Sequence, residues 1–83
     1  MISAMNWRDR IHSDPKVLAG KAAVRGTRIP VDLILERLGA GESIPDLVAA
    51  YPRLSAEDVH ATLTFAADSL RNEAVFAVPS EAA

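Results

Sequence analysis

Apolar residues recur at helical spacing in three stretches of the chain after residue 29. From Val31 onward they fall at i, i+3, i+4 and i+7, a spacing that lines one face of a helix. Pro30 precedes this stretch and favours a helix start, and Gly39 and Gly41 end it. We therefore predict a first helix over about 30–39. Its expected buried stripe consists of Val31, Ile34, Leu35 and Leu38.

The two later stretches each open with a serine that is followed three residues on by an aspartate. Side chains at that spacing satisfy free backbone N–H groups of a first helical turn, in the pattern called a capping box. Ser43 with Asp46 predicts a helix over about 43–51, and the same signal at Ser55 predicts one over about 55–73. The expected buried faces are Ile44, Leu47, Val48 and Tyr51 in the former and Val59, Leu63, Ala66, Ala67 and Leu70 in the latter.

The first third of the chain has a weaker pattern that favours strands. Residues 8–13 alternate loosely, and residues 22–29 are rich in β-branched side chains. Between them, residues 14–20 begin with Asp-Pro and end with Gly20, which predicts one short helical turn. We expect a hairpin over 10–29 that packs on the helices or pairs with a second copy, because a lone hairpin is marginally stable in water.

These elements predict a mainly α fold, a three-helix bundle with a helix-turn-helix that is preceded by a short N-terminal β-hairpin. The second helix is short, the third is long, and few residues join them. We expect a single domain over 11–72, a partly ordered arm over 1–10 and a tail over 74–83. The pattern indicates a fold more than a function, since many three-helix bundles bind no DNA.

Composition limits the size, the compartment and the chemistry of the protein. The 83 residues suffice for one small domain, and a content of 49% hydrophobic and 24% charged residues predicts a packed core. Only four residues are aromatic, so we expect a homodimer or another partner to stabilise that core. The absence of cysteine excludes disulfides and thiolate metal sites. Without a signal peptide or a long apolar run, a cytoplasmic protein with no membrane span is expected.

Charge is distributed unevenly, although the net charge is only −2. Residues 1–30 carry six lysines and arginines against two acids, whereas residues 31–83 carry three against nine. A contact with phosphates is therefore expected in the first third of the chain. The alternative is that the asymmetry arises by chance in so short a chain.

The segment Arg25-Gly26-Thr27-Arg28 gives this charge a specific geometry. Gly26 permits a positive φ, Thr27 and the free N–H groups of the next helix can hold an anion, and two guanidinium groups add bidentate reach. The alternative is structural: Gly26 makes the bend, Thr27 bonds locally, and an arginine pairs with Asp32 or Glu36. On the first interpretation the nucleic-acid or anion site consists of Arg8, Arg10, Lys21, Arg25, Thr27 and Arg28.

Other constellations favour neither catalysis nor a metal or cofactor site. His12 and His60 lack further ligands at metal-binding spacing, and no nucleophile has a supporting base. A last helix that reads a DNA groove would present its exposed first turns, but the carboxylates of Glu57 and Asp58 repel phosphates and are also explained by the helix dipole. The expected exposed residues of these turns are Ala56, Glu57, His60, Ala61 and Thr64.

Several apolar side chains fall outside the expected core stripes. Phe65 lies off the stripe of the last helix, and residues 74–78 form the uncharged run AVFAV. Such groups often mark contact surfaces. They give a candidate partner interface of Phe65, Val75, Phe76 and Val78. Alternatively, Phe65 completes a wide core face and the tail folds back, and Trp7 presents the same two alternatives.

A set of short motifs extends from Ile11 to about Arg71. It comprises Asp14-Pro15, Gly20-Lys21, the run Arg25-Gly26-Thr27-Arg28-Ile29-Pro30-Val31, the corner Gly41-Glu42-Ser43-Ile44, Tyr51-Pro52 with Leu54, and a helix that opens before Val59. In these motifs the chain resembles the small bacterial and archaeal proteins of domain-of-unknown-function family 433. Ala22-Ala23 stands where the family pattern more often has Pro followed by a larger apolar residue.

The resemblance implies a homeodomain-like three-helix fold with an N-terminal β element, often dimeric. It also implies a VapB-type antitoxin encoded beside a PIN-like nuclease, and it brings no catalytic residues. We therefore expect an antitoxin-like homodimer that binds a PIN-like ribonuclease toxin and its own operator DNA, with Arg25 and Arg28 serving phosphates or a partner's carboxylates. The alternative is a homodimeric protein–protein interaction module that does not bind DNA.

Overall fold

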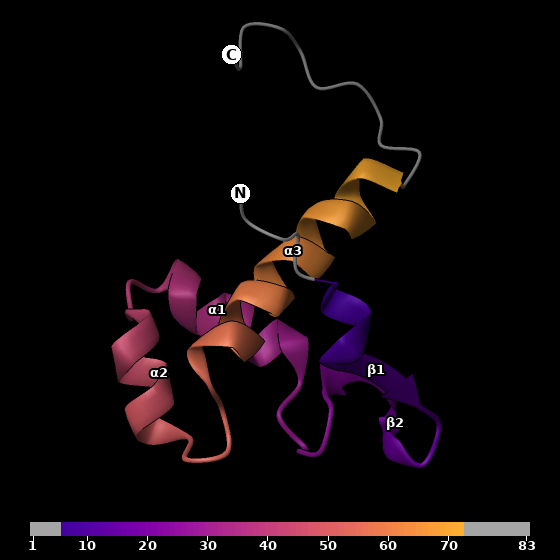
Figure 1. The fold of residues 1–83 in the computed structure, drawn as a ribbon, viewed down its shortest axis with the longest axis horizontal. Coiled ribbons are helices and arrows are strands. Elements are labelled where there is room, and N and C mark those ends of the chain that lie inside the picture. The colour runs from indigo at the N-terminus through magenta and orange to yellow at the C-terminus, as the bar shows by residue number, and fades with distance from the viewer. Residues whose placement is uncertain (1–5, 73–83) are drawn as a thin grey trace, which may run out of the picture.

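In the computed structural model, which describes residues 6–72, the N-terminal part of the chain forms a short 3₁₀ helix and a two-stranded antiparallel hairpin, and three α-helices follow (Figure 1). The expected hairpin and three helices are thus confirmed. The elements are η1 (Trp7–Asp9), β1 (Ile11–Asp14), β2 (Val17–Val24), α1 (Val31–Gly39), α2 (Ile44–Ala50) and α3 (Ala56–Asn72). No helix within these residues is long and apolar enough to cross a membrane.

The connection of the hairpin differs from the expected helical turn. The carboxylate of Asp14 accepts a hydrogen bond of 2.9 Å from the backbone N–H of Lys16, and this local bond tightens the turn so that β2 already begins at Val17. The prediction of a short helical turn over residues 14–20 was therefore wrong. The second strand also ends at Val24, before the arginine-rich turn, rather than continuing to residue 29.

The strand pairing is interrupted by an irregularity in β2. Ile11 pairs with Val24 at one end of the ladder, and the register shifts between Ser13 and Asp14. The extra residues of β2 include Leu18 and Ala19, whose φ angles of 51° and 56° are left-handed. Such a bulge bends and twists the strand that contains it. Gly20 follows at a φ of 86°.

The core lies where α1 meets the hairpin, α2 and α3. In Figure 1, α1 lies behind α3, between α2 on one side and the two strands on the other. Val31 and Ile34 of α1 are buried, and Leu35 and Leu38 are partly buried against them, so the predicted stripe of this helix is confirmed. The other buried apolar residues are Ile11, Ala23, Val24, Leu47, Leu54, Val59 and Ala61.

The buried face of α3 differs from the predicted one. Leu63 and Leu70 retain 43% and 64% of their accessible surface, whereas Thr62 is fully buried. The Thr62 hydroxyl donates to the backbone carbonyl of Asp58 at 2.9 Å, so a polar residue can face the core without an unsatisfied group. Val59 is buried as expected. The prediction that Leu63 and Leu70 belong to the buried face was wrong, because the polar residues Asp58 and Thr62 occupy that face.

The short helix η1 holds the N-terminal arm against α3. The indole N–H of Trp7 donates to the carboxylate of Asp68 at 2.7 Å. The Trp7 ring meets Phe65 edge-on, with 4.8 Å between ring centroids and 73° between planes. Both aromatic residues are partly buried against the core. The expected arm residues 1–5 and the tail 74–83 lie outside the described residues.

Candidate binding site at the Gly26 turn

The turn between β2 and α1 is closed by backbone and side-chain hydrogen bonds. The Val24 N–H donates to the carbonyl of Ile29 at 3.0 Å, and the Thr27 N–H donates to the carbonyl of Val24 at the same distance. Gly26 adopts a φ of +81°, the left-handed region that glycine enters without strain. The turn therefore has a fixed shape that depends on glycine at this position.

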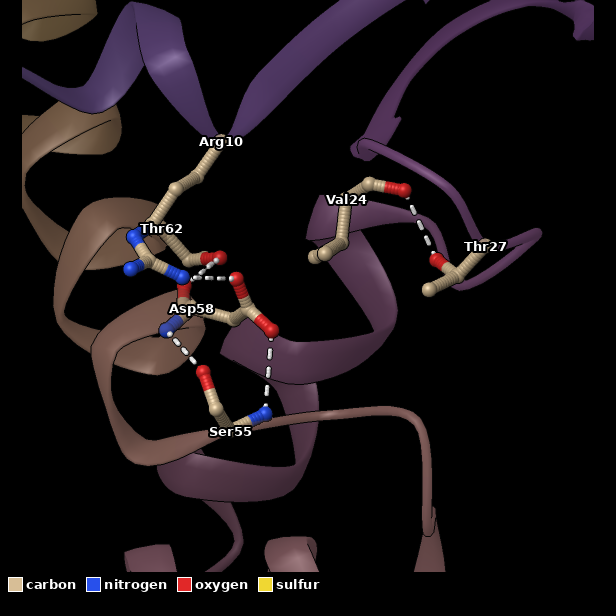
Figure 2. A network of polar contacts seen from close by, with 6 residues as sticks. All are labelled: Arg10, Val24, Thr27, Ser55, Asp58 and Thr62. Carbon is tan, nitrogen blue, oxygen red and sulfur yellow. Dashed lines mark hydrogen bonds and ion pairs between the residues drawn. The ribbon is translucent and has the colours of Figure 1, made fainter.

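The hydroxyl of Thr27 is engaged within this turn. It donates to the carbonyl of Val24 at 2.8 Å, as Figure 2 shows, and accepts from the N–H of Ile29 at 3.0 Å. Thr27 was a candidate anion ligand, and the structure gives it the local bonding that the structural alternative described. Its contribution to the site is to set the direction of the residues on either side of it.

Three arginines gather at the turn. Arg25 and Arg28 are exposed on it, and the guanidinium group of Arg53 donates to the carbonyl of Gly26 at 2.9 Å from the α2–α3 connection. Within residues 6–72, no carboxylate lies at ion-pair distance from these three side chains. We call Arg25, Arg28 and Arg53 the turn arginines. Sequence reasoning missed Arg53, although an isolated cation in a loop between two helices was a usable signal.

The other candidate cations occupy different positions. Arg10 pairs with Asp58 at 3.1 Å, and Lys21 pairs with Asp32 at 2.9 Å. The Lys21 ammonium holds the pKa of the Asp32 carboxyl below its usual range. Arg8 lies over the ring of Trp7 at 4.3 Å from the ring centroid, and its backbone carbonyl accepts a bond from the Arg25 guanidinium at 3.1 Å.

Figure 2 shows the polar network around Asp58 at the start of α3. One carboxylate oxygen accepts from Arg10, and the other accepts from the Ser55 N–H at 2.9 Å. The Ser55 hydroxyl in turn accepts from the Asp58 N–H at 3.2 Å, which completes the capping box. The side chain of Asp58 is only 11% exposed. This network supports the fold and leaves Asp58 little access to a ligand.

An open pocket lies beside two of the turn arginines, Arg28 and Arg53. Its volume is about 710 Å³, and it is formed by the hairpin, the Gly26 turn and the α2–α3 connection. Apolar groups of Val17, Ile29, Tyr51 and Pro52 line it, together with His12, Gly26, Thr27, Arg28 and Arg53. We call this pocket the turn groove. It combines an apolar wall with the side chains of two arginines, so it suits a ligand that has both an apolar part and a negative charge.

The exposed face at the start of α3 is narrower than expected. Glu57, His60 and Thr64 are exposed, but Ala61 is fully buried, so its predicted exposure was wrong. Asp58 is buried in its ion pair with Arg10, which leaves Glu57 as the exposed carboxylate of the first turn. The repulsion of phosphates by this helix is therefore weaker than the sequence suggested.

Metal-ligating groups do not cluster in the part of the chain that the structure describes. No group of three His, Asp or Glu side chains among these residues can hold a metal ion. His12 lines the turn groove, whereas His60 is exposed on α3. Of the candidate interface residues, Phe65 packs on Trp7. Val75, Phe76 and Val78 lie outside the described residues.

Comparison with known proteins relates this chain to a family of unknown function. The model of a family described as "Protein of unknown function (DUF433)" matches residues 11–66. An uncharacterized protein of Sinorhizobium fredii, y4eO, is 37% identical over 59 residues, which are 71% of this chain and 27% of that protein. The crystal structure of a DUF433 member protein from Anabaena variabilis superposes with a TM-score of 0.71 at 33% identity.

The matched segment covers a different share of each relative. The superposition with the Anabaena variabilis protein includes 77% of this chain and 63% of the other. The chain therefore spans about a quarter of the Sinorhizobium fredii protein and less than two thirds of the solved relative. The shared part contains both strands, the Gly26 turn and most of the three helices.

Proposed function

This chain belongs to the DUF433 family of proteins of unknown function, and on that basis we propose that it is an antitoxin-like protein that binds and masks a PIN-like ribonuclease toxin. The proposal assigns no catalytic step and no cofactor to the chain. The family's resemblance to VapB-type antitoxins supplies the class of partner. The turn arginines and the turn groove supply the surface that contacts it.

One observation supports this proposal: three arginines lie at a single turn, and none of them has an ion-pair partner among residues 6–72. Arg53 reaches across from the α2–α3 connection to the carbonyl of Gly26, and Arg28 lines the same groove as Arg53. The fold pairs Arg10 and Lys21 with carboxylates, whereas the internal bonds of Arg25 and Arg53 go to the backbone carbonyls of Arg8 and Gly26 and leave their charges unneutralised. Unpaired guanidinium groups beside an apolar wall favour an anionic protein surface as the partner.

The active site of a PIN-like ribonuclease offers such a surface, because its acidic residues hold a metal ion. An arginine fork binds a carboxylate with two parallel hydrogen bonds. Guanidinium groups that enter that site would compete with the metal and with the RNA phosphates for the same carboxylates. Masking of this kind requires no chemistry from the antitoxin.

Copurification with the product of a neighbouring PIN-like reading frame tests the proposal. We expect the wild-type chain to copurify with that nuclease and to suppress its cleavage of RNA. The double variant Arg28→Gln/Arg53→Gln should suppress cleavage at least tenfold less well, since two charge-assisted contacts are lost. Arg71→Gln removes the same charge at the other end of α3 and serves as the control.

Two results would contradict the proposal. One is a nuclease that neither copurifies with the chain nor loses activity in its presence. The other is equal suppression by the wild type and by Arg28→Gln/Arg53→Gln, which would place the contact elsewhere. Circular dichroism of each variant checks that the fold is retained, and loss of suppression by Arg71→Gln would indicate a general effect of charge.

We further propose a homeodomain-like helix-turn-helix that binds operator DNA. The short helix α2, the connection through Arg53 and the long helix α3 support this arrangement. His60 and Thr64 stand on the exposed side of α3, and the acid beside them, Asp58, is neutralised by Arg10. The turn arginines then act on phosphates in the absence of the toxin.

Salt dependence tests this DNA contact. The affinity for the chain's own promoter should fall steeply between 50 and 200 mM salt, because each phosphate contact releases a counterion. Arg25→Ala plus Arg28→Ala should weaken binding and reduce the slope by about one per contact. If the two substitutions leave the affinity for DNA unchanged, the turn does not contact DNA.

A second candidate function is a homodimeric interaction module without a DNA role. The observation that favours it is an exposed apolar stripe on α3: Leu63 is 43% exposed, Leu70 is 64% exposed, and Ala67 stands between them at helical spacing. A second copy can cover such a stripe. Leu63→Glu plus Leu70→Glu should then convert a dimer into a monomer in analytical ultracentrifugation, and a monomeric wild type would rule this candidate out.

A further inference from the structure

The turn groove is built from three segments that are distant in sequence. The hairpin contributes His12 and Val17, the turn contributes residues 26–29, and the α2–α3 connection contributes residues 51–53. The hydrogen bond from Arg53 to the carbonyl of Gly26 holds two of these segments together. Because the backbone of each segment is fixed by such bonds, the groove exists before any ligand binds.

The chemistry of the groove differs from side to side. Val17, Ile29 and the ring of Tyr51 present apolar surface, and these residues are only partly buried. Arg28 and Arg53 are exposed and border the same space. A matching ligand therefore carries a bulky apolar group and, close to it, an anionic group.

This pairing favours a peptide over a nucleic acid. A DNA or RNA backbone presents phosphates at regular spacing and no aliphatic group, so it would leave the apolar wall of the groove without a partner. A peptide with an aspartate or glutamate beside a leucine, isoleucine or phenylalanine satisfies both sides at once. A pocket volume of about 710 Å³ is also large enough for a side chain together with its backbone.

We propose that the turn groove binds an acidic, apolar peptide segment of the partner protein. One bulky apolar side chain lies against Val17, Ile29 and Tyr51. A neighbouring carboxylate lies between the guanidinium groups of Arg28 and Arg53. This inference rests on the proposed function and specifies the chemistry of the segment that the chain recognises.

Selection from a random peptide library displayed on phage tests the inference without any nuclease. The intact chain is immobilised, and the sequences that it enriches are compared with those retained by the variant Pro52→Asp. Pro52 is exposed in the groove, so this substitution adds a carboxylate there with little loss of packing. We expect enriched peptides that combine an acidic residue with a bulky apolar residue, and no such enrichment on the variant.

Affinities are then measured by fluorescence anisotropy with the most enriched peptide, synthesised with a label. Arg28→Gln keeps the bond from Arg53 that holds the groove together and should weaken peptide binding about fivefold, since one charge-assisted contact is lost. The double variant Arg28→Gln/Arg53→Gln should weaken it about tenfold or more. Arg71→Gln should leave binding unchanged. Nuclear magnetic resonance should show the largest amide shifts at residues of the groove, and shifts centred on α3 would place the peptide elsewhere.

Several outcomes would overturn the inference. These are a selection without enrichment, enriched peptides that are basic, enriched peptides bound equally by Pro52→Asp, and displacement of the peptide by dimerisation of the chain. Enrichment of acidic, apolar peptides together with an unaffected nuclease would leave the groove assignment standing and remove the antitoxin role. If the selection fails but the nuclease is still suppressed through Arg28 and Arg53, the peptide inference is wrong and the proposed function stands.

Discussion

The guanidinium group of Arg10 lies 3.1 Å from the carboxylate of Asp58 and ties the residue before β1 to the first turn of α3. The pair joins positions that are 48 residues apart in the chain. Asp58 also caps α3 through Ser55, so one carboxylate serves both a local and a long-range contact. The charge of Arg10 is thereby committed to the fold, whereas no carboxylate among residues 6–72 pairs with the turn arginines.

Substitution of Asp58 by alanine should destabilise the protein by about 2–4 kcal/mol. The change leaves Arg10 and the Ser55 N–H without their partner, and each unsatisfied group costs about 1–3 kcal/mol. The Ser55 hydroxyl still accepts from the backbone N–H of residue 58, so half of the capping box is kept. Because Arg10 is 40% exposed, water screens part of its charge and lowers the cost of leaving it unpaired. Urea denaturation measures the effect. Glu57→Ala, at the exposed neighbouring position, should cost less than about 1 kcal/mol, and an equal cost at both sites would contradict this role for Asp58.

Replacing Gly26 by alanine should lower the stability of the protein, whereas replacing Gly39 by alanine should raise it. Neither site places an atom within 4 Å of an added Cβ, so space does not distinguish them. Gly26 has a φ of +81°, and a left-handed alanine costs about 1–2 kcal/mol. Gly39 ends α1 without a positive φ, and alanine there should stabilise by about 0.5–1 kcal/mol. Thermal unfolding should move in opposite directions, and a stabilising Gly26→Ala would be incompatible with the turn described here.

Substitutions on α3 separate the observed core face from the one that the sequence suggested. Phe65→Ala removes the partner of Trp7 and should cost about 2–3 kcal/mol, less than a fully buried phenylalanine. Leu70→Ala, at a position that is 64% exposed, should change stability by about 0.5 kcal/mol or less. Trp7 is the only tryptophan in the chain, so its fluorescence reports directly on this contact. If Leu70→Ala destabilised the protein more than Phe65→Ala, Leu70 would belong to the buried face of α3, as the sequence predicted.

The fold was accessible from the sequence where the signals were local. The serine–aspartate pairs at Ser43 and Ser55 indicated two helix starts, and both capping boxes are present. The face of α3 was not accessible, because Asp58 and Thr62 are polar residues whose burial depends on bonds to Arg10 and to the helix backbone. Apolar periodicity alone assigns such residues to the surface.

The candidate site was accessible only in part, for a similar reason. The run from Arg25 to Arg28 identified the turn, since Gly26 and the flanking cations are adjacent in sequence. The contributions of Arg53 and Tyr51 required the tertiary fold, which brings the α2–α3 connection beside the turn. Charge patterning also could not show that Lys21 is paired with Asp32.

The protein should become less stable as the pH is lowered through the acidic range, because of the cap of α2. Hydrogen bonds from the backbone N–H and the side chain of Ser43 hold the pKa of the Asp46 carboxyl below its usual range. An aspartate whose pKa is lower in the folded than in the unfolded state stabilises the fold above its ordinary pKa of about 3.9, and that contribution is lost as the pH falls through the folded value. The free energy of unfolding should therefore decline below about pH 4.

The variant Asp46→Asn isolates this contribution, because asparagine keeps the shape of the side chain but has no charge to titrate. Its stability should be lower than that of the wild type at neutral pH and should change less between pH 5 and pH 2. Glu36→Gln removes the same charge from an exposed position of α1 and provides the matched control. Urea denaturation at each pH gives the comparison. If the slopes of Asp46→Asn and the wild type coincide, the charge of Asp46 does not contribute to the cap, and the lowered pKa of Asp32 beside Lys21 becomes the remaining source of acid sensitivity to test.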